Sequence, residues 1–247
     1  MAANRTTRAI VGDPQAAMKL LTGGKEALHR FSLARMLGLD SKSVDALFSE
    51  LEADNRFSDH IASMARHADR PLGGFARPQD LYVICRTVKP AVVIETGVAS
   101  GLSSAYILLA LEDNASGRLF SIDLPDADTE ELLGVVLTRL PEGSKSGWVV
   151  PDWLRARWDL RIGKSSDLLP SLLAEVKQAE IFLHDSEHSY ENMMFEFGQA
   201  WPTLADGGFV LSDDVNLALT KGAFYGFAKK VGRTPERLYA GFGALRK

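Results

Sequence analysis

The stretch that most constrains the fold spans residues 91–104 and reads AVVIETGVASGLSS. Its four opening residues are apolar and mostly β-branched, which predicts a short strand buried on both faces. We expect the strand to end at Glu95 and to lead through a turn with Gly97 and Gly101 into a helix. Glycine lets the backbone approach a ligand where a Cβ would clash, so this order predicts a ligand-binding turn at the carboxyl end of a first parallel strand.

The residues of this turn restrict the kind of ligand. A dinucleotide fingerprint needs a second glycine where this chain has Ala99, and a phosphate loop needs a lysine after Gly101. An acid at the strand end would repel a pyrophosphate and suits a ligand with an ammonium group, such as S-adenosylmethionine. Here the chain resembles class I S-adenosylmethionine-dependent methyltransferases, whose first motif is an acid-x-Gly turn of this kind. A glycine turn in another α/β protein is the alternative.

The rest of the chain alternates between strand and helix patterns. The predicted strands are residues 91–95, 118–123, 158–162, 180–185 and 209–213, and two runs at 237–240 and 242–246 predict a closing hairpin. The predicted helices are residues 78–88, 102–111, 129–140, 166–176, 189–204 and 219–231. This alternation predicts an α/β fold with a doubly wound, mostly parallel sheet covered on both faces. The resemblance implies the seven-stranded, Rossmann-like sheet of the methyltransferases.

The first part of the chain has a different pattern. Residues 15–67 show amphipathic helical spacing and no convincing strand, with Ser41 as a helix cap. The sequence RPLGG at 70–74 predicts a linker. We therefore expect an N-terminal helical extension over residues 1–70, serving as a cap or a dimer contact, and a methyltransferase domain over residues 71–247.

Composition excludes several classes of protein. The 247 residues are 46% hydrophobic and 24% charged, with a net charge of −4, so there is no basic surface for nucleic acid. No apolar run approaches the roughly 20 residues that span a bilayer, and the N-terminus does not have the pattern of a secretory signal. Cys85 is the single cysteine, which excludes an internal disulfide. We expect a cytoplasmic protein without a membrane partner.

Acids end four of the five main predicted strands: Glu95, Asp123, Asp185 and the pair Asp213–Asp214. In an open parallel sheet, ligands bind beyond the carboxyl ends of the strands, so these residues are the first candidates for a site. Each acid alone could cap a turn. Several at one edge repel each other unless a cation or a cationic ligand is present.

The segment HDSEHSY at 184–190 offers two interpretations. Read as H-x-x-E-H it matches a zinc-protease pattern, which requires both histidines on one helix face. His184 falls within a predicted strand, so we expect its ring to pack in the strand and not to converge with the ring of His188.

The better match is to a metal-assisted branch of the methyltransferases, which includes natural-product sugar O-methyltransferases and cephalosporin hydroxylase-like proteins. These carry an acid and a histidine three apart after the fourth strand and paired acids after the fifth. The corresponding residues here are Asp185 with His188, and Asp213 with Asp214. The resemblance implies that the three aspartates bind Mg²⁺ or another divalent cation, and that His188 takes a proton from the acceptor. The alternatives are a helix cap for His188 and a turn for the paired acids.

The same resemblance assigns the cofactor contacts. Asp123 is implied to bind the ribose, Ser165 the adenine side, and Asp185 to bridge the cofactor and the metal. The amino-acid end of S-adenosylmethionine is implied to lie against Glu95 and Gly97 of the first turn, and Thr96, Ser100 and Gly101 are implied to be further cofactor-binding residues there.

The resulting hypothesis is an enzyme that methylates a hydroxyl of a small molecule: sugar, phenol, polyketide and lipid acceptors are all open. Three alternatives remain at this point: a metal-independent methyltransferase acting on nitrogen or oxygen, a non-catalytic cofactor-binding module that regulates a partner through the N-terminal helices, and a nicotinamide dehydrogenase. The amphipathic N-terminal helices favour a homodimer or a higher homo-oligomer.

Overall fold

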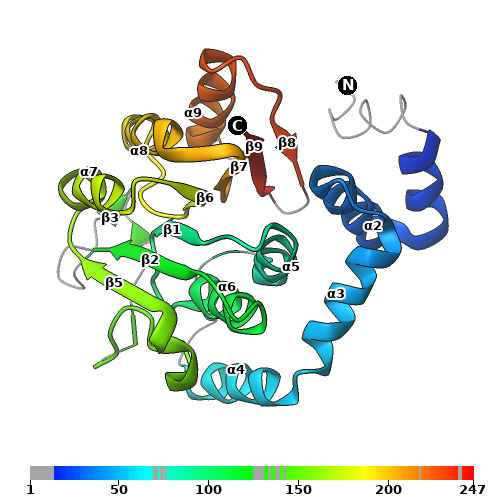
Figure 1. Cartoon of the computed structure of the whole chain (residues 1–247), viewed down its shortest axis with the longest axis horizontal. Coiled ribbons are helices and arrows are strands. Elements are labelled where there is room, and N and C mark those ends of the chain that lie inside the picture. Colours follow the sequence, from blue (N-terminus) through cyan, green and yellow to red (C-terminus); the bar gives the residue numbers. More distant parts are fainter. Residues whose placement is uncertain are drawn as a thin grey trace. The chain divides into compact units, whose positions relative to one another are not determined.

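The structure is a computed structural model that describes residues 14–68, 72, 75, 77–124, 131–132, 135–136, 140–141, 143–216, 218–238 and 241–247 (Figure 1). It contains two compact units, the first ending at Leu51 and the second spanning Glu52–Lys247. The predicted linker at 70–74 falls largely outside the described residues. The division thus lies before helix α4 (Asn55–His67) and not after it. Within the second unit, Phe57 of α4 packs edge-on against Tyr106, with ring centroids 4.9 Å apart.

The first unit is built from helix α2 (Pro14–Leu37) and most of helix α3 (Ser41–Ala53). Helix α2 is interrupted at Gly24, whose φ of 70° is not helical. The start of α3 differs in detail from the prediction, because the Asp40 carboxylate, and not Ser41, accepts a hydrogen bond from the amide of Ser43 (2.8 Å). The Arg30 guanidinium lies 4.2 Å from the centre of the Phe48 ring, which packs α2 against α3.

The second unit is organised around a seven-stranded sheet with the order β5-β2-β1-β6-β7-β9-β8. The strands are β1 (Val92–Thr96), β2 (Arg118–Asp123), β5 (Trp158–Ile162), β6 (Ala179–His184), β7 (Leu204–Ser212), β8 (Glu236–Arg237) and β9 (Gly243–Arg246). The first five are mutually parallel, and β9 is antiparallel to both β7 and β8. The predicted mostly parallel, seven-stranded sheet with a closing hairpin is therefore confirmed.

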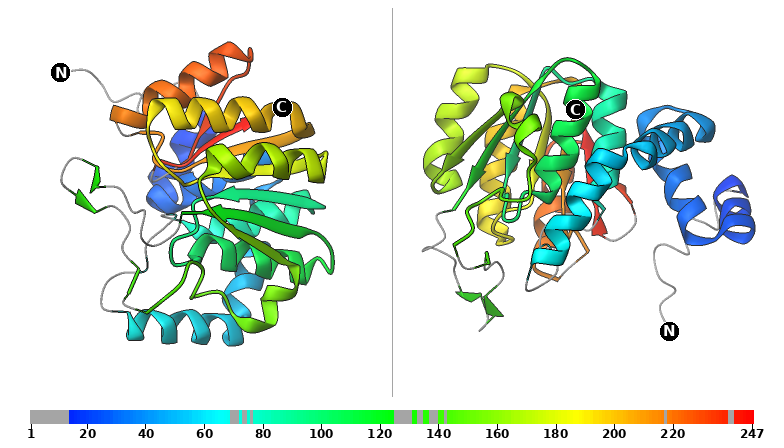
Figure 2. Two further views of the ribbon diagram at one scale, coloured as in Figure 1. Left: turned by 90° about the vertical axis from the view of Figure 1, so that its left-hand side faces the viewer. Right: turned by 90° about the horizontal axis from the view of Figure 1, so that it is seen from below.

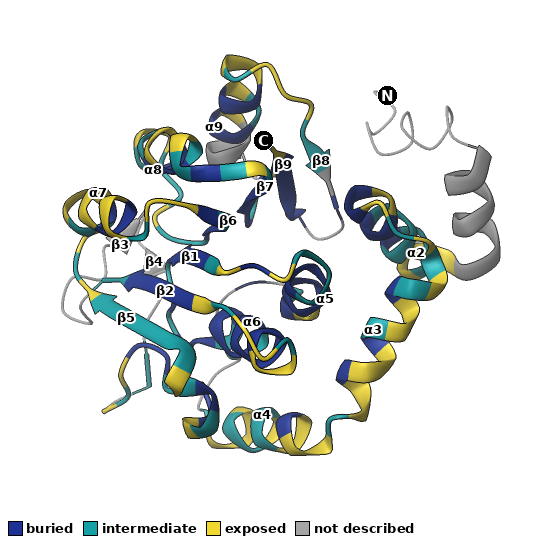
Figure 3. Ribbon diagram, in the orientation of Figure 1, coloured by how far each residue is buried: buried dark blue, intermediate teal, exposed yellow. Residues whose placement is uncertain are grey.

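Helices cover both faces of this sheet. Helices α5 (Pro78–Val88) and α6 (Leu102–Asp113) lie on one face, and α7 (Ser165–Val176), α8 (Tyr190–Thr203) and α9 (Ala218–Lys230) lie on the other (Figures 1 and 2). The central strands are consequently buried along most of their length, whereas β5 at the sheet edge is only partly buried (Figure 3). This is why the central strands read as continuous apolar runs and do not alternate.

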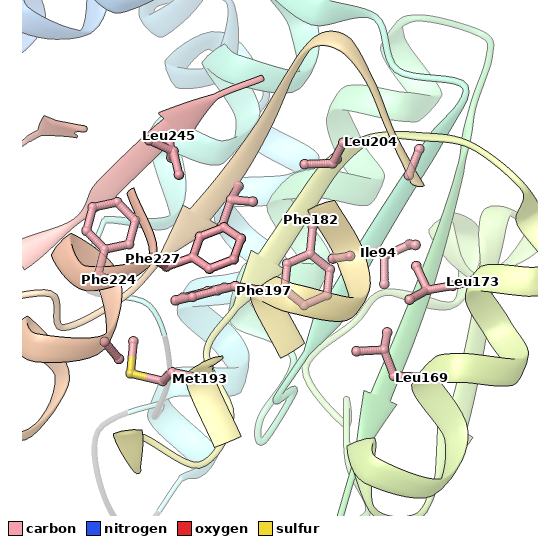
Figure 4. Packing of buried hydrophobic residues seen from close by; sticks show 14 of the residues in the cluster. Ile94, Leu169, Leu173, Phe182, Met193, Phe197, Leu204, Phe224, Phe227 and Leu245 are labelled. Atoms are coloured by element: carbon pink, nitrogen blue, oxygen red, sulfur yellow. The ribbon is translucent and has the colours of Figure 1, made fainter. Parts of the chain in front are cut away.

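The core under α7, α8 and α9 is aromatic and aliphatic (Figure 4). Phe182 of β6 lies between side chains of α7 and α8, and Phe197 of α8 contacts Phe224 and Phe227 of α9 with ring centroids 6.2 and 5.5 Å apart. Burying each such side chain contributes about 1.5–3 kcal/mol. This packing fixes the ends of β6 and α8, between which the site loop runs.

The prediction of a helix at 129–140 was wrong. Within the predicted helix at 129–140, the described residues form two antiparallel strands, β3 (Glu131–Leu132) and β4 (Val135–Val136). Strand β7 begins at Leu204, directly after α8, and includes the sequence DGG at 206–208. A Cβ on Gly208 would come within 2.7 Å of the carbonyl oxygen of Glu180 on the neighbouring strand, so this position needs glycine. A short 3₁₀ helix, η2 (Asp152–Arg157), precedes β5. No helix in the described part of the chain is long and apolar enough to cross a membrane.

Candidate functional site

The predicted glycine turn joins β1 to α6 at the carboxyl edge of the sheet. Its backbone takes positive φ values at Gly97 (83°), Ala99 (48°) and Gly101 (88°). A Cβ on Gly97 would lie 2.0 Å from the carbonyl oxygen of Asp185, and one on Gly101 would lie 2.6 Å from the Cα of Gly147. Both positions therefore need glycine because another part of the protein backbone packs against them. The sequence had instead predicted that a ligand makes this close approach.

Asp123 ends β2 beside this turn. Its two carboxylate oxygens accept hydrogen bonds from the amides of Val98 (3.2 Å) and Ala99 (3.1 Å). The side chain thus holds the turn in place, as the turn-cap interpretation expects. A carboxylate has about four acceptor positions, so lone pairs remain for the two hydroxyls of a ribose.

Glu95 is buried one residue before the end of β1. Its carboxylate accepts hydrogen bonds from the hydroxyls of Ser103 (2.6 Å), Ser104 (2.6 Å) and Ser121 (2.7 Å). Burial raises the pKa of this carboxyl more than the three serines lower it, and the charge of Asp123 raises it further. The geometry gives Glu95 a role in fastening β1 to β2 and α6, behind the turn. A direct contact with the cofactor stays a prediction.

Three other predicted cofactor residues also bond within the protein. Thr96 is fully buried and donates a hydrogen bond to Glu196 (2.6 Å), on the opposite face of β1 from Glu95. The Ser165 hydroxyl lies 3.3 Å from the amide oxygen of Asn192. The carbonyl of Ser100 accepts from the amide of Val149 (3.0 Å). Thr96 and Ser165 thus use their side chains, and Ser100 its carbonyl group, for bonds within the protein, and the cofactor contacts of all three stay predictions.

The acids that follow β6 and β7 are brought together as predicted. The Asp185, Asp213 and Asp214 carboxyl groups lie close enough for their charges to interact. Burial and the charges of Asp213, Glu95 and Asp214 raise the pKa of Asp185 well above its usual value. Burial and Asp214 raise the pKa of Asp213 to about 6. Asp214 has φ 52°, and burial raises the pKa of its carboxyl too.

His188 lies against this acidic cluster. Its Nε2 atom is 4.0 Å from Asp185 Oδ1. Burial and the neighbouring His184 lower its pKa to about 4, although Glu196 partly opposes this. The ring is therefore neutral near pH 7 and able to accept a proton. The helix-cap interpretation was wrong, because Ser189 caps α8 by accepting a hydrogen bond from the amide of Asn192 (3.2 Å).

The two histidines of the segment do converge, contrary to the prediction. Their ring centroids are 5.3 Å apart at an interplanar angle of 68°, because the loop after β6 turns back over the strand end. His184 is fully buried at the end of β6, in agreement with its reading as a packed strand residue, and its Nδ1 lies 2.7 Å from Glu196 Oε2. The pattern is not on a helix, so the zinc-protease interpretation has no support.

Glu196 is the residue that sequence reasoning missed. It is fully buried in α8 and accepts hydrogen bonds from His184, Thr96, Ser186 (2.8 Å) and Asn192 (3.1 Å). Burial alone would raise its pKa, but the charge and hydrogen bond of His184 together with the hydroxyl donors lower it to about 2. The sequence did indicate that Glu196 is buried: it lies three residues after Met193 and four before Ala200, on the apolar face of the helix.

The donors of the acidic cluster fit a hard divalent cation. Three carboxylates meet there, and Asp213 Oδ1 is buried without a hydrogen-bond partner among the described residues. A cation would relieve the mutual repulsion that raises these pKa values. However, no group of three or more His, Cys, Asp or Glu side chains in the described ranges is already arranged around one metal position. The chemistry fits, while a preformed coordination geometry is lacking.

A known protein family matches the part of the chain that contains this site. Residues 94–215 match the family described as a methyltransferase domain. This range begins within β1 and ends just after Asp213–Asp214, so it contains every residue discussed above. A search of curated protein sequences gives no match.

Solved structures show the same fold at low sequence identity. An O-methyltransferase from Bacillus cereus in complex with SAH is 13% identical, with a TM-score of 0.56 over 82% of this chain and 96% of its own. The O-methyltransferase TomG from Streptomyces achromogenes, in complex with SAM, is 18% identical, with a TM-score of 0.54 over 83% and 94%. An SAH-bound methyltransferase from Podospora anserina is 12% identical, with a TM-score of 0.54 over 84% and 96%. The family match over residues 94–215 and the seven-stranded fold are both those of class I S-adenosylmethionine-dependent methyltransferases.

Proposed function

We propose that this methyltransferase methylates a hydroxyl group of a small molecule. One observation carries the proposal: the glycine turn and the loop that carries Asp185 and His188 are in backbone contact. The amide of Asp185 donates to the carbonyl of Thr96 (2.8 Å), and Gly97 packs directly on the carbonyl of Asp185. A neutral imidazole is thereby held next to the turn where the cofactor is expected.

When bound, S-adenosylmethionine supplies a methyl group on a sulfonium centre. The Asp123 carboxylate would hold the ribose, and the turn from Gly97 to Gly101 would hold the amino-acid end. His188 would accept the proton of the acceptor hydroxyl as the oxygen attacks the methyl carbon. The protein's main contribution would be to position that oxygen for in-line attack. The O-methyltransferases among the solved structures of this fold support oxygen as the acceptor atom.

A divalent cation would be held by Asp185, Asp213 and Asp214. It would lower the pKa of the acceptor hydroxyl and fix its position. The alternative within the same reaction is catalysis without metal, in which these acids would serve only as caps and orienting groups.

The first test is calorimetric titration with S-adenosylhomocysteine, with and without Mg²⁺, and with NAD as the control ligand. Micromolar binding of S-adenosylhomocysteine and none of NAD are expected. Asp123→Ala should weaken the binding about 10- to 100-fold, since hydrogen bonds to a charged group contribute about 1.5–3 kcal/mol. Affinity within about threefold of wild type would contradict the ribose assignment. The matched control is Asp159→Ala, whose carboxylate pairs with Arg161 within β5.

The second test is methyl transfer to a panel of hydroxyl compounds that includes sugars, phenols, polyketides and lipids. Turnover that is lost in EDTA, restored by Mg²⁺ and reduced by Asp214→Ala is expected. Unchanged turnover in EDTA and in Asp214→Ala would remove the metal and leave the metal-independent reaction. Binding of S-adenosylhomocysteine without turnover of any compound would instead favour a non-catalytic cofactor-binding module. The homodimer and the cytoplasmic location stay predictions.

A further inference from the structure

The segment before η2, residues 147–150, lies directly against the glycine turn, and the proposed reaction does not use it. The amide of Gly147 donates to the carbonyl of Ala99 (2.9 Å), and the amide of Val149 donates to the carbonyl of Ser100 (3.0 Å). Two successive carbonyl groups of the turn are thus bound by this one segment. Its position can therefore determine how well the turn receives a ligand.

The turn depends on such contacts because its backbone conformation is unfavourable. Ala99 has φ 48°, a left-handed conformation that a residue with a Cβ keeps only where its surroundings enforce it. The Asp123 carboxylate accepts from the amide of Ala99, and Gly147 donates to its carbonyl. Gly101 is also close, since a Cβ there would lie 2.6 Å from the Cα of Gly147. A displacement of Gly147 would therefore release Ala99 on one side.

Helix α4 is bonded to the same segment. Nε2 of His60 lies 2.9 Å from the carbonyl oxygen of Val149, and since a carbonyl only accepts, this nitrogen carries the hydrogen. The His60 ring also packs edge-on against Trp153 of η2, with ring centroids 5.2 Å apart. The Arg56 guanidinium lies 3.9 Å from the centre of the Trp153 ring. Helix α4 is thereby joined to the segment and to the 3₁₀ helix that follows it.

Helix α4 also contacts the helix that follows the glycine turn. Phe57 is buried and packs against Tyr106, which lies near the start of α6. The helix thus has contacts both at α6 and at the segment that binds the turn. Apolar packing against α6 helps to fix where α4 lies, and the hydrogen bond from His60 joins the segment to that fixed helix.

We propose that His60 is a positioning residue for S-adenosylmethionine. It holds the segment 147–150 against the carbonyl groups of the turn, while Asp123 holds the amides, so the turn has its binding conformation before the cofactor arrives. A preorganised loop binds more tightly because less ordering is needed on binding. His60 itself is not expected to touch the cofactor. The inference rests on the proposed placement of the cofactor at this turn.

The proposal gives α4 a role that the sequence did not predict. Residues 1–70 were expected to form a cap or a dimer contact. The contacts of His60 instead assign the last helix of that region to the support of the cofactor turn, in agreement with its place in the second compact unit.

The test uses two variants that separate the ring of His60 from its hydrogen-bond donor. His60→Phe keeps a ring against Trp153 and removes the N–H group that reaches Val149. His60→Gln loses the ring and keeps an amide N–H near the position of Nε2. His67→Phe is the matched control on the same helix, because Nδ1 of His67 contacts the carbonyl of Ser63 within α4 (2.7 Å).

The first readout is the dissociation constant of S-adenosylhomocysteine, measured by calorimetry on the full chain. It should rise about 5- to 10-fold in His60→Phe, as for the loss of one hydrogen bond, and stay within about threefold of wild type in His60→Gln and His67→Phe. With a hydroxyl compound that is methylated, the KM for S-adenosylmethionine should rise in His60→Phe. The kcat should stay within about threefold, because the turn is affected and the loop that carries His188 is not.

The second readout is amide hydrogen exchange, which does not require turnover. The amides of residues 97–101 and 147–150 should exchange faster in His60→Phe, while those of β6 and β7 keep their wild-type rates. Arg155 still donates to the carbonyls of Gly147 (2.9 Å) and Val150 (3.0 Å), so the segment should be displaced and not unfolded.

Three results would overturn the proposal. An affinity of His60→Phe for S-adenosylhomocysteine within about threefold of wild type would show that His60 does not affect cofactor binding. Equal losses in His60→Phe and His60→Gln would mean that the ring matters and the hydrogen bond does not. Faster exchange throughout the sheet in His60→Phe, with a lower urea midpoint, would make His60 a residue of general stability.

Failure of the proposed function gives a different result. If the wild type does not bind S-adenosylhomocysteine at all, the placement of the cofactor is wrong for every variant. The exchange readout then still decides whether His60 holds the segment against the turn.

Discussion

Two buried glutamate side chains lie on opposite faces of β1, near its carboxyl end. They differ in their hydrogen-bond partners and in the direction of their pKa shifts. Glu95 lies in β1 and is bound by three serine hydroxyls, and its pKa is raised. Glu196 lies in α8 and is bound by His184, Thr96, Ser186 and Asn192, and its pKa is lowered to about 2.

The comparison shows that burial does not by itself determine the charge of a carboxyl group. Desolvation raises the pKa of both residues. Hydroxyl donors alone do not overcome it at Glu95, whose neighbour Asp123 adds repulsion. At Glu196 an imidazole that can carry positive charge reverses the outcome. Glu95 thus joins β1 to α6 and β2, whereas Glu196 is ionised near pH 7.

The largest expected effect is the loss of stability when either carboxylate is removed. Glu196→Ala should lower the free energy of unfolding by about 3–5 kcal/mol, because it leaves a buried imidazole and several donors without their acceptor. Glu95→Ala should cost less, about 1–3 kcal/mol, because neutral serine hydroxyls can rotate to other partners. Urea unfolding of both variants measures the difference. Equal losses would mean that the charge of Glu196 is not important for stability.

The second prediction concerns the pH dependence of stability, for which the two residues have opposite signs. The folded pKa of Glu196, about 2, lies below its unfolded value of 4.5, so its contribution is present above pH 4.5 and is lost as the pH falls towards 2. The loss should be on the order of 3 kcal/mol. The folded pKa of Glu95 is raised, so its contribution is present below its unfolded pKa and is lost as the pH rises through the folded one.

Two amide variants separate these contributions. Glu196→Gln should flatten the acid side of the stability profile, and Glu95→Gln should instead become relatively more stable as the pH rises. Urea midpoints measured from pH 3 to pH 8 for both variants and the wild type check this. Parallel profiles in the two variants would show that the carboxyl groups titrate alike.

The same pair of residues shows what the sequence could and could not predict. The fold was predictable because strand and helix patterns are local: the residue bounds of β2, β5 and α5 agree with the prediction. The structure within residues 129–140 was not predictable, since a helical pattern of apolar residues there does not distinguish a helix from a short hairpin.

The sequence predicted at which edge of the sheet the site lies. Strand ends bring Glu95, Asp123, Asp185 and Asp213 together because parallel strands meet at one edge. The partner of each acid was not predictable. Which face of β1 a side chain takes, and which helix residue lies opposite, depends on packing between segments about 100 residues apart, as for Thr96 and Glu196.

The third prediction compares single donors to the two glutamates. Thr96→Val removes one hydrogen bond to Glu196 at nearly constant volume and should cost about 1.5–3 kcal/mol, because the acceptor is charged. The affinity for S-adenosylhomocysteine should stay close to that of the wild type, since the hydroxyl points towards α8. A large loss of affinity with unchanged stability would instead place the Thr96 hydroxyl on the cofactor, as the sequence resemblance implied.

The smallest expected effect is that of Ser104→Ala, the matching change on the other face of β1. The Ser104 hydroxyl donates to Glu95 Oε2, but Ser121 donates to the same oxygen (2.7 Å), so the acceptor keeps a partner. Burial raises the pKa of Glu95, whereas the pKa of Glu196 is lowered to about 2. A neutral, partly redundant hydrogen bond contributes about 0.5–1.5 kcal/mol, so Ser104→Ala should cost less than Thr96→Val in the same urea titration. The reverse order would mean that Glu95 is the more strongly charged residue, and that three hydroxyls stabilise a buried carboxylate better than a histidine does.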